Sequence, residues 1–457
     1  NNNPSMKSFG VVFLLLCLAH QTFQAQTVSV LFSNGEYQLV TGTKDPNGVA
    51  WGWFDDTINE TGWALLRIES NPKYSNTMQS YAAGFAEGAL TQARIYQMFN
   101  AIMDSYSAYP ESQKTQLYDW LNEEWEWMSD QVESNPSESY WHHISKVQSQ
   151  TQGIYDGYAL VAQGDEASFT FEDLIFMNAL ADHGDIVASF DPAYRIGALQ
   201  KTLSREELMN QINYRLHCSA FIKVLGDLSD IYFAHNMWTN YKYMFRIYKF
   251  YDMKLSDAKA QVISMSSYPG FLASYDDYYV TSSGLAVMET TNSILNDTLY
   301  DYVTPQSVLY WVRTVIANRY TNNGHDWVHL FEKYNSGTYN NQWMVLDYKK
   351  FTAGTLISDG ALWILEQIPG FCEKGDVTSY LRLGYWPSYN VPFFETIYNK
   401  SGYIPYYQAY GNWFSYMACP RAQIFRRDQG KVADLDGFRS FMRYNQYQTD
   451  PYSLGSP

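Results

Sequence analysis

Residues 217–251 read HCSAFIKVLGDLSDIYFAHNMWTNYKYMFRIYKFY, and this stretch decides the fold of the second half of the chain. Apolar and β-branched residues lie on both sides of Gly226-Asp227, a dipeptide typical of a tight turn between strands. The pattern predicts a two-stranded hairpin with Cys218 at the start of its first strand. The pattern over 241–253, which overlaps the end of this stretch, predicts either a further strand or a short helix.

Upstream of this hairpin the apolar residues follow a helical period. The sequence predicts helices over about 75–106, 111–132 and 138–163, and a further one that starts at Phe171 and breaks at Gly184. The first of these helices contains a run of small residues that would let it pack closely against a neighbour, namely Ala82, Ala83, Gly84, Ala86 and Gly88.

The remaining segments are mainly of strand type. Short strand-like segments occur at 29–42, 49–57 and 61–70 before the helices, and at 262–267, 285–291 and 342–351 after the hairpin. Two helices are expected near 305–320 and 354–368, whereas the polar residues 191–214 are expected to form a linker or an exposed segment. A helix-rich first half followed by a strand-rich second half predicts an α+β fold.

The composition excludes several classes of protein. The chain has 457 residues, of which 46% are hydrophobic and 17% charged, so it can bury a large core and is not a disordered chain. Its formal charge of −16 repels phosphate backbones, so nucleic acid is not expected as a partner. The sequence contains no HExxH, GxSxG, GxGxxG, CxxC or Walker motif. We therefore expect neither a metal nor a cofactor.

The N-terminal segment predicts export from the cell interior. Residues 1–5 are expected to be upstream sequence, and the segment from Met6 to Ala25 combines Lys7 with a short apolar run. Residues 1–25 are thus predicted to be upstream sequence followed by a signal peptide, rather than a buried N-terminal helix. No later segment is long and apolar enough to span a membrane. A secreted or lysosomal glycoprotein agrees with the three Asn-X-Ser/Thr motifs at Asn59, Asn296 and Asn399.

The cysteines point to a free thiol. Cys17 lies in the predicted signal peptide, which leaves Cys218, Cys372 and Cys419 in the mature chain. An odd number of cysteines in an oxidising compartment leaves at least one of them unpaired or intermolecular. The economical arrangement is a disulfide between Cys372 and Cys419, with Cys218 free. Such a thiol is either a candidate for chemistry or an inert buried side chain.

The stretch around Cys218 also resembles a known family. Further blocks with the same resemblance follow in order, namely WVRTVIANRY (311–320), NSGTYNNQWMVLDYKKF (335–351), GYWPSYNVPFFETIY (384–398) and the segment 421–454. From about residue 35 to the end, the chain is similar to the phospholipase B-like, or lamina-ancestor, proteins. Because members of that family usually continue further, this chain is expected to be incomplete or a truncated paralogue.

The resemblance implies an N-terminal nucleophile (Ntn) hydrolase with an αββα sandwich. In that family one precursor cuts itself, here between His217 and Cys218, into residues 26–217 and 218–457, which stay associated in one fold. The cut would give Cys218 a free α-amino group, which titrates near ~7.7–8 and can act as general base for its own thiol. The thiol would then form a thioester acyl-enzyme that water hydrolyses.

The resemblance also implies roles for other side chains. His235 and Asn236, at the far end of the hairpin, are expected near the nucleophile, with His235 orienting the thiolate or binding the acyl oxygen. Asn340 and Asn341 are candidate oxyanion donors, and Arg421 matches a late arginine of related hydrolases. The alternatives are a structural role for His235, an Asx turn for Asn340 and Asn341, and a surface or structural ion pair for Arg421.

The expected substrate is a lipid-like acyl ester or an N-acyl amide. A catalytically silent secreted glycoprotein, which uses the fold for binding, is the alternative function. A papain-type cysteine protease is disfavoured, because the chain lacks a CGSCW-like signature and His235 is too near Cys218 in sequence. The sequence leaves open whether the protein is retained in lysosomes or exported, and which oligomeric state it adopts.

Overall fold

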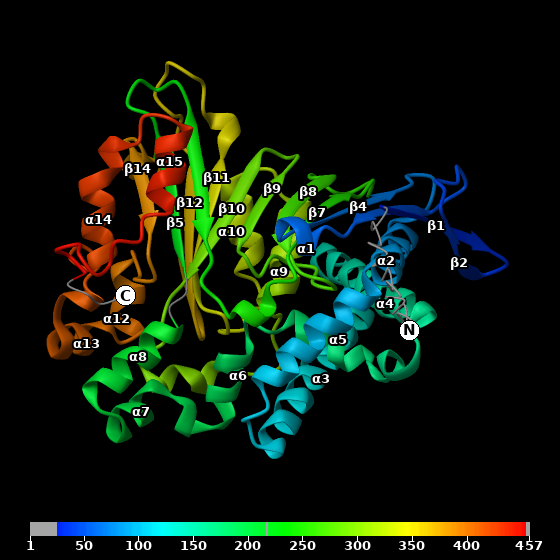
Figure 1. Ribbon diagram of the computed structural model, residues 1–457, viewed down its shortest axis with the longest axis horizontal. Helices are drawn as coiled ribbons and strands as arrows, with labels where there is room; N and C mark the ends of the chain where they lie inside the picture. Colours follow the sequence, from blue (N-terminus) through cyan, green and yellow to red (C-terminus); the bar gives the residue numbers. More distant parts are fainter. Residues whose placement is uncertain (1–24, 216–217, 454–457) are drawn as a thin grey trace, which may run out of the picture.

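The computed structural model describes residues 25–215 and 218–453. Over these residues the chain forms two β-sheets with helices packed on their outer faces (Figure 1). This mixture of sheets and helices confirms the predicted α+β class. The predicted signal peptide, apart from Ala25, lies outside the described residues.

The larger sheet contains eleven strands among the described residues, in the order β13-β12-β11-β10-β9-β8-β7-β4-β3-β1-β2. Its strands are β1 (Gln26–Ser33), β2 (Glu36–Thr41), β3 (Ala50–Asp55), β4 (Ala64–Ser70), β7 (Ile247–Asp252), β8 (Val262–Ser267), β9 (Tyr278–Thr281), β10 (Leu285–Thr291), β11 (Asn341–Asp347), β12 (Leu362–Ile368) and β13 (Phe371–Asp376). Among the described strands, β4 and β7 alone pair in parallel. The chain between them forms helices and the hairpin of the smaller sheet before it returns to the larger sheet.

The smaller sheet contains β14 (Tyr385–Ser388), β5 (Ser219–Val224) and β6 (Ile231–Asn236), all antiparallel and in that order. The strands β5 and β6 form the predicted hairpin, and Gly226 and Asp227 lie in its turn. Ala220 pairs with His235 in this hairpin. The hairpin prediction is therefore confirmed, with Cys218 directly before β5.

Helices form two groups around the sheets (Figure 1). The first group shares the main apolar core with the larger sheet: α2 (Asn76–Ser105), α3 (Glu111–Ser134), α4 (Ser139–Val161), α5 (Phe171–Asn178), α6 (His183–Phe190), α9 (Tyr310–Tyr320) and α10 (Gly324–Phe331). The second group shares an aromatic cluster with the smaller sheet: α7 (Ile196–Thr202), α8 (Arg205–Arg215), α12 (Glu395–Lys400), α13 (Tyr403–Tyr410), α14 (Pro420–Asp428) and α15 (Leu435–Met442). Short helices are α1 (Ile58–Thr61) and α11 (Thr378–Leu381). Among all these described helices, none has the length and apolarity needed to cross a bilayer.

The two sheets pack face to face around β5. Every second residue of β5 from Ala220 to Val224 packs against apolar side chains of β10, β11 and β12. Phe221 points the other way and packs against Phe425 of α14 and Phe438 of α15. Because strand side chains alternate between faces, β5 is covered on both sides. Around β5 the layers therefore run helix, sheet, sheet, helix.

The helices α2 and α4 pack with their backbones in contact. A Cβ atom on Gly84 would lie 2.0 Å from the carbonyl oxygen of Gln150, and one on Gly88 would lie 1.9 Å from that of Ile154. Two glycines of α4 approach the backbone of α2 equally closely. The close contact predicted from the small residues is confirmed.

Three predicted segments differ in the structure. Residues 191–214, predicted as a linker or an exposed segment, contain α7 and α8 and are exposed at many positions, whereas Ile196 and Leu208 join the aromatic cluster of the smaller sheet. The predicted helix at 354–368 is wrong, since its last seven residues form β12. A strand buried on both faces has a continuous apolar run, which periodicity cannot distinguish from a buried helix. The break expected at Gly184 lies at 179–182.

Candidate active site

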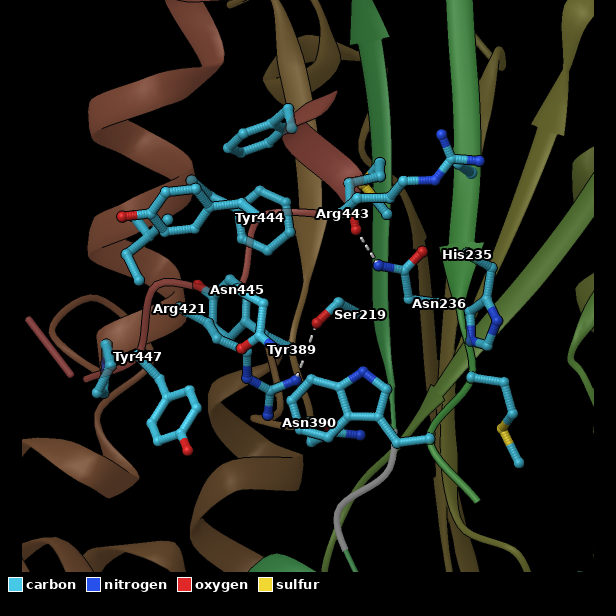
Figure 2. A pocket seen from close by; sticks show the side chains of 18 of the residues that line it. Ser219, His235, Asn236, Tyr389, Asn390, Arg421, Arg443, Tyr444, Asn445 and Tyr447 are labelled. Atoms are coloured by element: carbon cyan, nitrogen blue, oxygen red, sulfur yellow. Dashed lines mark hydrogen bonds between the residues drawn. The ribbon is translucent and has the colours of Figure 1, made fainter. Parts of the chain in front are cut away.

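A cavity of about 1080 Å³ lies beside the smaller sheet. Its walls come from β6 and the residues after it, from 389–391, from the start of α14 and from the segment 441–453. Figure 2 shows that neighbouring residues of β6 leave the hairpin on opposite sides, with Asn236 facing the C-terminal segment and His235 facing away from it. This volume is at the upper end of the range typical of small-molecule sites.

Cys218 is fully buried beside this cavity. Its Sγ lies 4.0 Å from Asp277 Oδ2 and 3.5 Å from Met237 Sδ. Burial raises the pKa of the Cys218 thiol well above its usual value, and the carboxyl groups of Asp277 and Glu289 raise it further. In this uncut chain the thiol is therefore protonated. The described residues that line the cavity do not include Cys218.

Asp277 and Glu289 form a buried carboxyl pair next to the thiol. Both side chains are completely shielded from solvent, and the hydroxyl of Tyr339 donates to Asp277 Oδ2 at 2.8 Å. Burial raises the pKa of both carboxyls, that of Glu289 to about 7, and the neighbouring Glu289 raises the pKa of Asp277 further. The pair therefore retains a proton close to neutral pH.

His235 completes the surroundings of the thiol. Cys218, His235 and Asp277 each contribute one S, N or O atom to a group whose members all lie within 4.8 Å of one another. Burial lowers the pKa of His235 to about 4, an effect larger than the opposing one of the nearby backbone groups. The imidazole is therefore neutral near pH 7. Its Nε2 has no hydrogen-bond partner among the described residues.

Arg421 binds the backbone of Cys218 from the other side. Its guanidinium donates to the carbonyl oxygen of Cys218 and to Ser219 Oγ, the latter at 3.2 Å. It also lies 5.0 Å from the centre of the Trp238 ring. Burial lowers the pKa of Arg421, but a guanidinium stays charged in proteins. One positive charge is thus fixed at the start of β5.

The three predicted asparagines are dispersed. Asn236 lines the cavity and donates to the carbonyl oxygen of Met442 (Figure 2). Asn340 and Asn341 are buried at the start of β11. Asn340 donates to Asp185 Oδ2 at 3.1 Å, whereas the Asn341 amide has no hydrogen-bond partner within the described parts of the chain. Neither residue belongs to the described cavity lining, so the structure does not bring these two candidate oxyanion donors to the cavity.

The predicted disulfide between Cys372 and Cys419 is wrong, because all three cysteines in the described residues are free. Cys372 lies on β13, at the edge of the larger sheet. Cys419 directly precedes α14, in the aromatic cluster on the outer face of the smaller sheet. A disulfide needs Cα atoms within about 7 Å of each other, and the two cysteines belong to different layers of the fold.

The sequence analysis missed the acidic residues of the site. Asp277 stands in the aromatic run SYDDYY (274–279), and Glu289 lies in the buried strand LAVMETT (285–291). An acid inside an otherwise apolar strand is costly to bury, so it often marks a functional site. That signal was present in the sequence. The proximity of both acids to Cys218 required the tertiary structure.

Together, the fold and the site define an α+β protein in which a buried cysteine begins an inner strand next to a cavity. The sequence matches the Phospholipase B family over residues 50–457. The chain therefore belongs to the Phospholipase B family, in agreement with the resemblance of its sequence blocks.

Its relatives are similar over most of the chain. Phospholipase B-like protein B of Dictyostelium discoideum is 40% identical over 431 residues, which are 93% of this chain and 74% of that protein. Phospholipase-B 81 of Drysdalia coronoides is 39% identical in an alignment that covers 98% of this chain and 82% of that protein. Phospholipase B-like 1 of Homo sapiens is 40% identical over 425 residues, or 92% and 75%.

Proposed function

We propose that this chain is the precursor of an Ntn hydrolase that cuts itself before Cys218 and then cleaves an acyl ester or amide bond of a lipid-like substrate. The observation that supports this most is the environment of Cys218. Its thiol lies beside the buried carboxyl of Asp277, and Arg421 binds its carbonyl oxygen, where an inner strand begins next to a cavity. The order helix, sheet, sheet, helix also supports an Ntn sandwich, and the names of the relatives support a phospholipase-like substrate.

In the proposed self-cleavage, Asp277 takes the proton of the thiol. Asp277 Oδ2 lies 4.0 Å from Sγ, and in its ionised form a carboxylate whose pKa is raised takes up a proton more readily than an ordinary one. The thiolate attacks the carbonyl carbon of His217, which lies outside the described residues. The peptide C–N bond breaks, the nitrogen of Cys218 takes a proton, and a thioester links residue 217 to Sγ. Water hydrolyses this thioester, leaving a carboxylate on His217 and a free thiol on Cys218.

In the mature enzyme the new α-amino group of Cys218 acts as the base for the thiol. The thiolate attacks the acyl carbon of the substrate, the alcohol or amine leaves with a proton, and water hydrolyses the thioester. The cavity offers aromatic walls for an acyl chain, with Phe233, Trp238 and Trp413 among its lining residues. The proposal includes a secreted or lysosomal location and no nucleic-acid partner.

The test of self-cleavage compares the wild-type chain with Cys218→Ala after expression in a secreting cell. Denaturing mass spectrometry and N-terminal sequencing should find two fragments for the wild type, one of which begins at Cys218, and one intact chain for the variant. Cys372→Ala is the matched control, because Cys372 lies on the edge strand β13 and outside the cavity lining; it should be cut like the wild type.

The same experiment decides against the proposal if folded wild-type protein stays intact. Full burial of Cys218 in the uncut chain favours, in that case, a silent glycoprotein that binds its ligand in the cavity. If cutting occurs, diacyl phospholipids and N-acyl amides are offered to the cut enzyme, and release of free fatty acid is measured for each.

A further inference from the structure

The side chains around the thiol have the composition of a zinc site. Thiolate sulfur, imidazole nitrogen and carboxylate oxygen are the ligands that zinc takes in proteins. In the described part of the chain, Cys218, His235 and Asp277 are the one group of three such residues whose ligand atoms all lie within 4.8 Å of one another. The atoms of a tetrahedral site with these ligands lie about 3.5 Å apart. Small side-chain rotations are therefore sufficient to close the group around one ion.

Two ligand atoms of this group are buried without a hydrogen bond. Asp277 Oδ1 and His235 Nε2 have no partner among the described residues, and an unsatisfied buried polar atom costs free energy. A bound cation would satisfy both.

The group also has an entrance. Cys218 and Asp277 are fully shielded, whereas His235 and Met237 line the cavity. An ion can therefore arrive from the cavity past His235. Zinc sites with three protein ligands take a water molecule as fourth ligand.

We propose that the uncut chain binds one zinc ion through Cys218, His235 and Asp277, and that this ion withholds the thiol from self-cleavage. On binding, the thiol and the Asp277 carboxyl release their protons to solvent, Zn–S, Zn–N and Zn–O bonds form, and no oxidation state changes. A thiolate bound to zinc is a weaker nucleophile than a free one, so the ion must leave before the chain is cut. The inhibition rests on the proposed function, whereas the binding site stands independently of it.

The test uses cobalt(II), which takes the same ligands as zinc and gives a near-ultraviolet charge-transfer band when a thiolate binds it. We expect this band on titration of the purified full-length protein without a histidine tag, at one cobalt per uncut chain, and its loss when zinc is added. The cut fraction of each sample is read on a denaturing gel. Cys218→Ser should abolish the band, and His235→Gln should weaken cobalt binding at least about tenfold.

Matched controls separate this site from other cobalt ligands. Cys372→Ala and Cys419→Ala should keep the band. On α10, His325 is exposed and His329, four residues later, is half-buried. This pair can bind cobalt, but without a thiolate band, so His329→Ala should leave the band unchanged. Circular dichroism verifies that each variant is folded.

The outcomes are distinct. Absence of the band in the wild type, or a band that persists in Cys218→Ser, overturns the zinc site. If cobalt binds and a chelator leaves the rate of self-cleavage unchanged, the inhibition is overturned. A cobalt-binding chain that is never cut, even with chelator, supports the site and contradicts the proposed function.

Discussion

Arg421 fixes the residue on which the proposed chemistry depends. Its guanidinium binds both the carbonyl oxygen of Cys218 and the hydroxyl of Ser219, and it stacks near Trp238. A planar guanidinium can make these contacts at once, whereas an ammonium group is a single point charge. The first residue of β5 is thus held by a side chain from α14, more than two hundred positions away.

We therefore predict that Arg421→Lys slows self-cleavage about 100-fold, because a displacement of about 1 Å at a reacting group has effects of that size. The rate is measured as the appearance of the fragment that begins at Cys218. Arg426→Lys is the control, since Arg426 lies on the same helix but is exposed and donates to the carbonyl oxygen of Met417 at 3.1 Å. Equal slowing in both variants would contradict a positioning role for Arg421.

The three glycosylation motifs differ in their surroundings. Asn59 and Asn399 are exposed, whereas Asn296 is partly buried and its amide donates to the carbonyl oxygen of Lys400 at 3.1 Å. A glycan would replace one of the two hydrogens on that amide nitrogen and would have to fit beside this contact and the partly buried side chain.

We expect glycans on Asn59 and Asn399 but not on Asn296 in protein from a secreting cell. The check is the mass shift on glycosidase treatment of three variants, Asn59→Gln, Asn296→Gln and Asn399→Gln. The first and third should each lose one glycan relative to the wild type. Loss of a glycan in Asn296→Gln would contradict the prediction.

At the scale of elements, the contact between α2 and α4 sets the main helical layer. Both helices use glycines where they cross, so that no side chain separates the two backbones. The hydrogens of glycine are the largest groups that fit there, because packed interiors leave few voids.

Gly88→Ala should lower the free energy of unfolding by at least about 3 kcal/mol, because its Cβ would lie 1.9 Å from the carbonyl oxygen of Ile154 and the helices must separate. Gly184→Ala on α6 is the control, since its Cβ would meet no atom within 4 Å; its stability should stay within about 1 kcal/mol of the wild type. Urea denaturation followed by circular dichroism measures both. Similar stability of the two variants would show that the helices can separate without cost.

The whole molecule contains several acids that burial keeps protonated. Burial raises the pKa of Asp182 from 3.8 to about 8, and that of Glu366 to about 7. A group whose pKa is higher in the folded state stabilises the fold fully below its unfolded pKa. This contribution is lost as the pH rises through the folded value. These acids therefore stabilise the fold at acidic pH relative to pH 8. The buried imidazoles of His183 and His235, whose pKa values burial lowers to about 3 and about 4, act in the opposite direction below about pH 6.5.

We predict that the free energy of unfolding falls between about pH 6.5 and pH 8, above the range in which the buried histidines titrate, and that Asp182→Asn reduces this slope by up to about 1.4 kcal/mol per pH unit. The amide oxygen of the variant can still accept the hydrogen bond that Thr338 donates to Asp182 at 2.6 Å. Asp436→Asn is the control, because Asp436 is exposed. Urea denaturation at several pH values measures the slopes, and identical slopes for wild type and Asp182→Asn would refute the assignment.

Much of the fold could be predicted from local pattern. The β5–β6 hairpin follows from β-branched residues around Gly226-Asp227, and α2 follows from its helical period. The helix predicted over 354–368 is wrong, because its last part is the strand β12. This strand is buried on both faces and therefore lacks the alternation of apolar and polar residues by which a strand is recognised.

The sequence by itself determined the α+β class, the hairpin that begins after Cys218 and the membership of the family, because each depends on residues close together in the chain or on ordered blocks of it. Only the tertiary structure decided what surrounds the thiol. Asp277, Glu289 and Arg421 reach Cys218 from three separate elements. It also separated Cys372 from Cys419 and kept Asn340 and Asn341 out of the cavity lining. Long-range proximity arises from the packing of layers, and no local period or spacing encodes it.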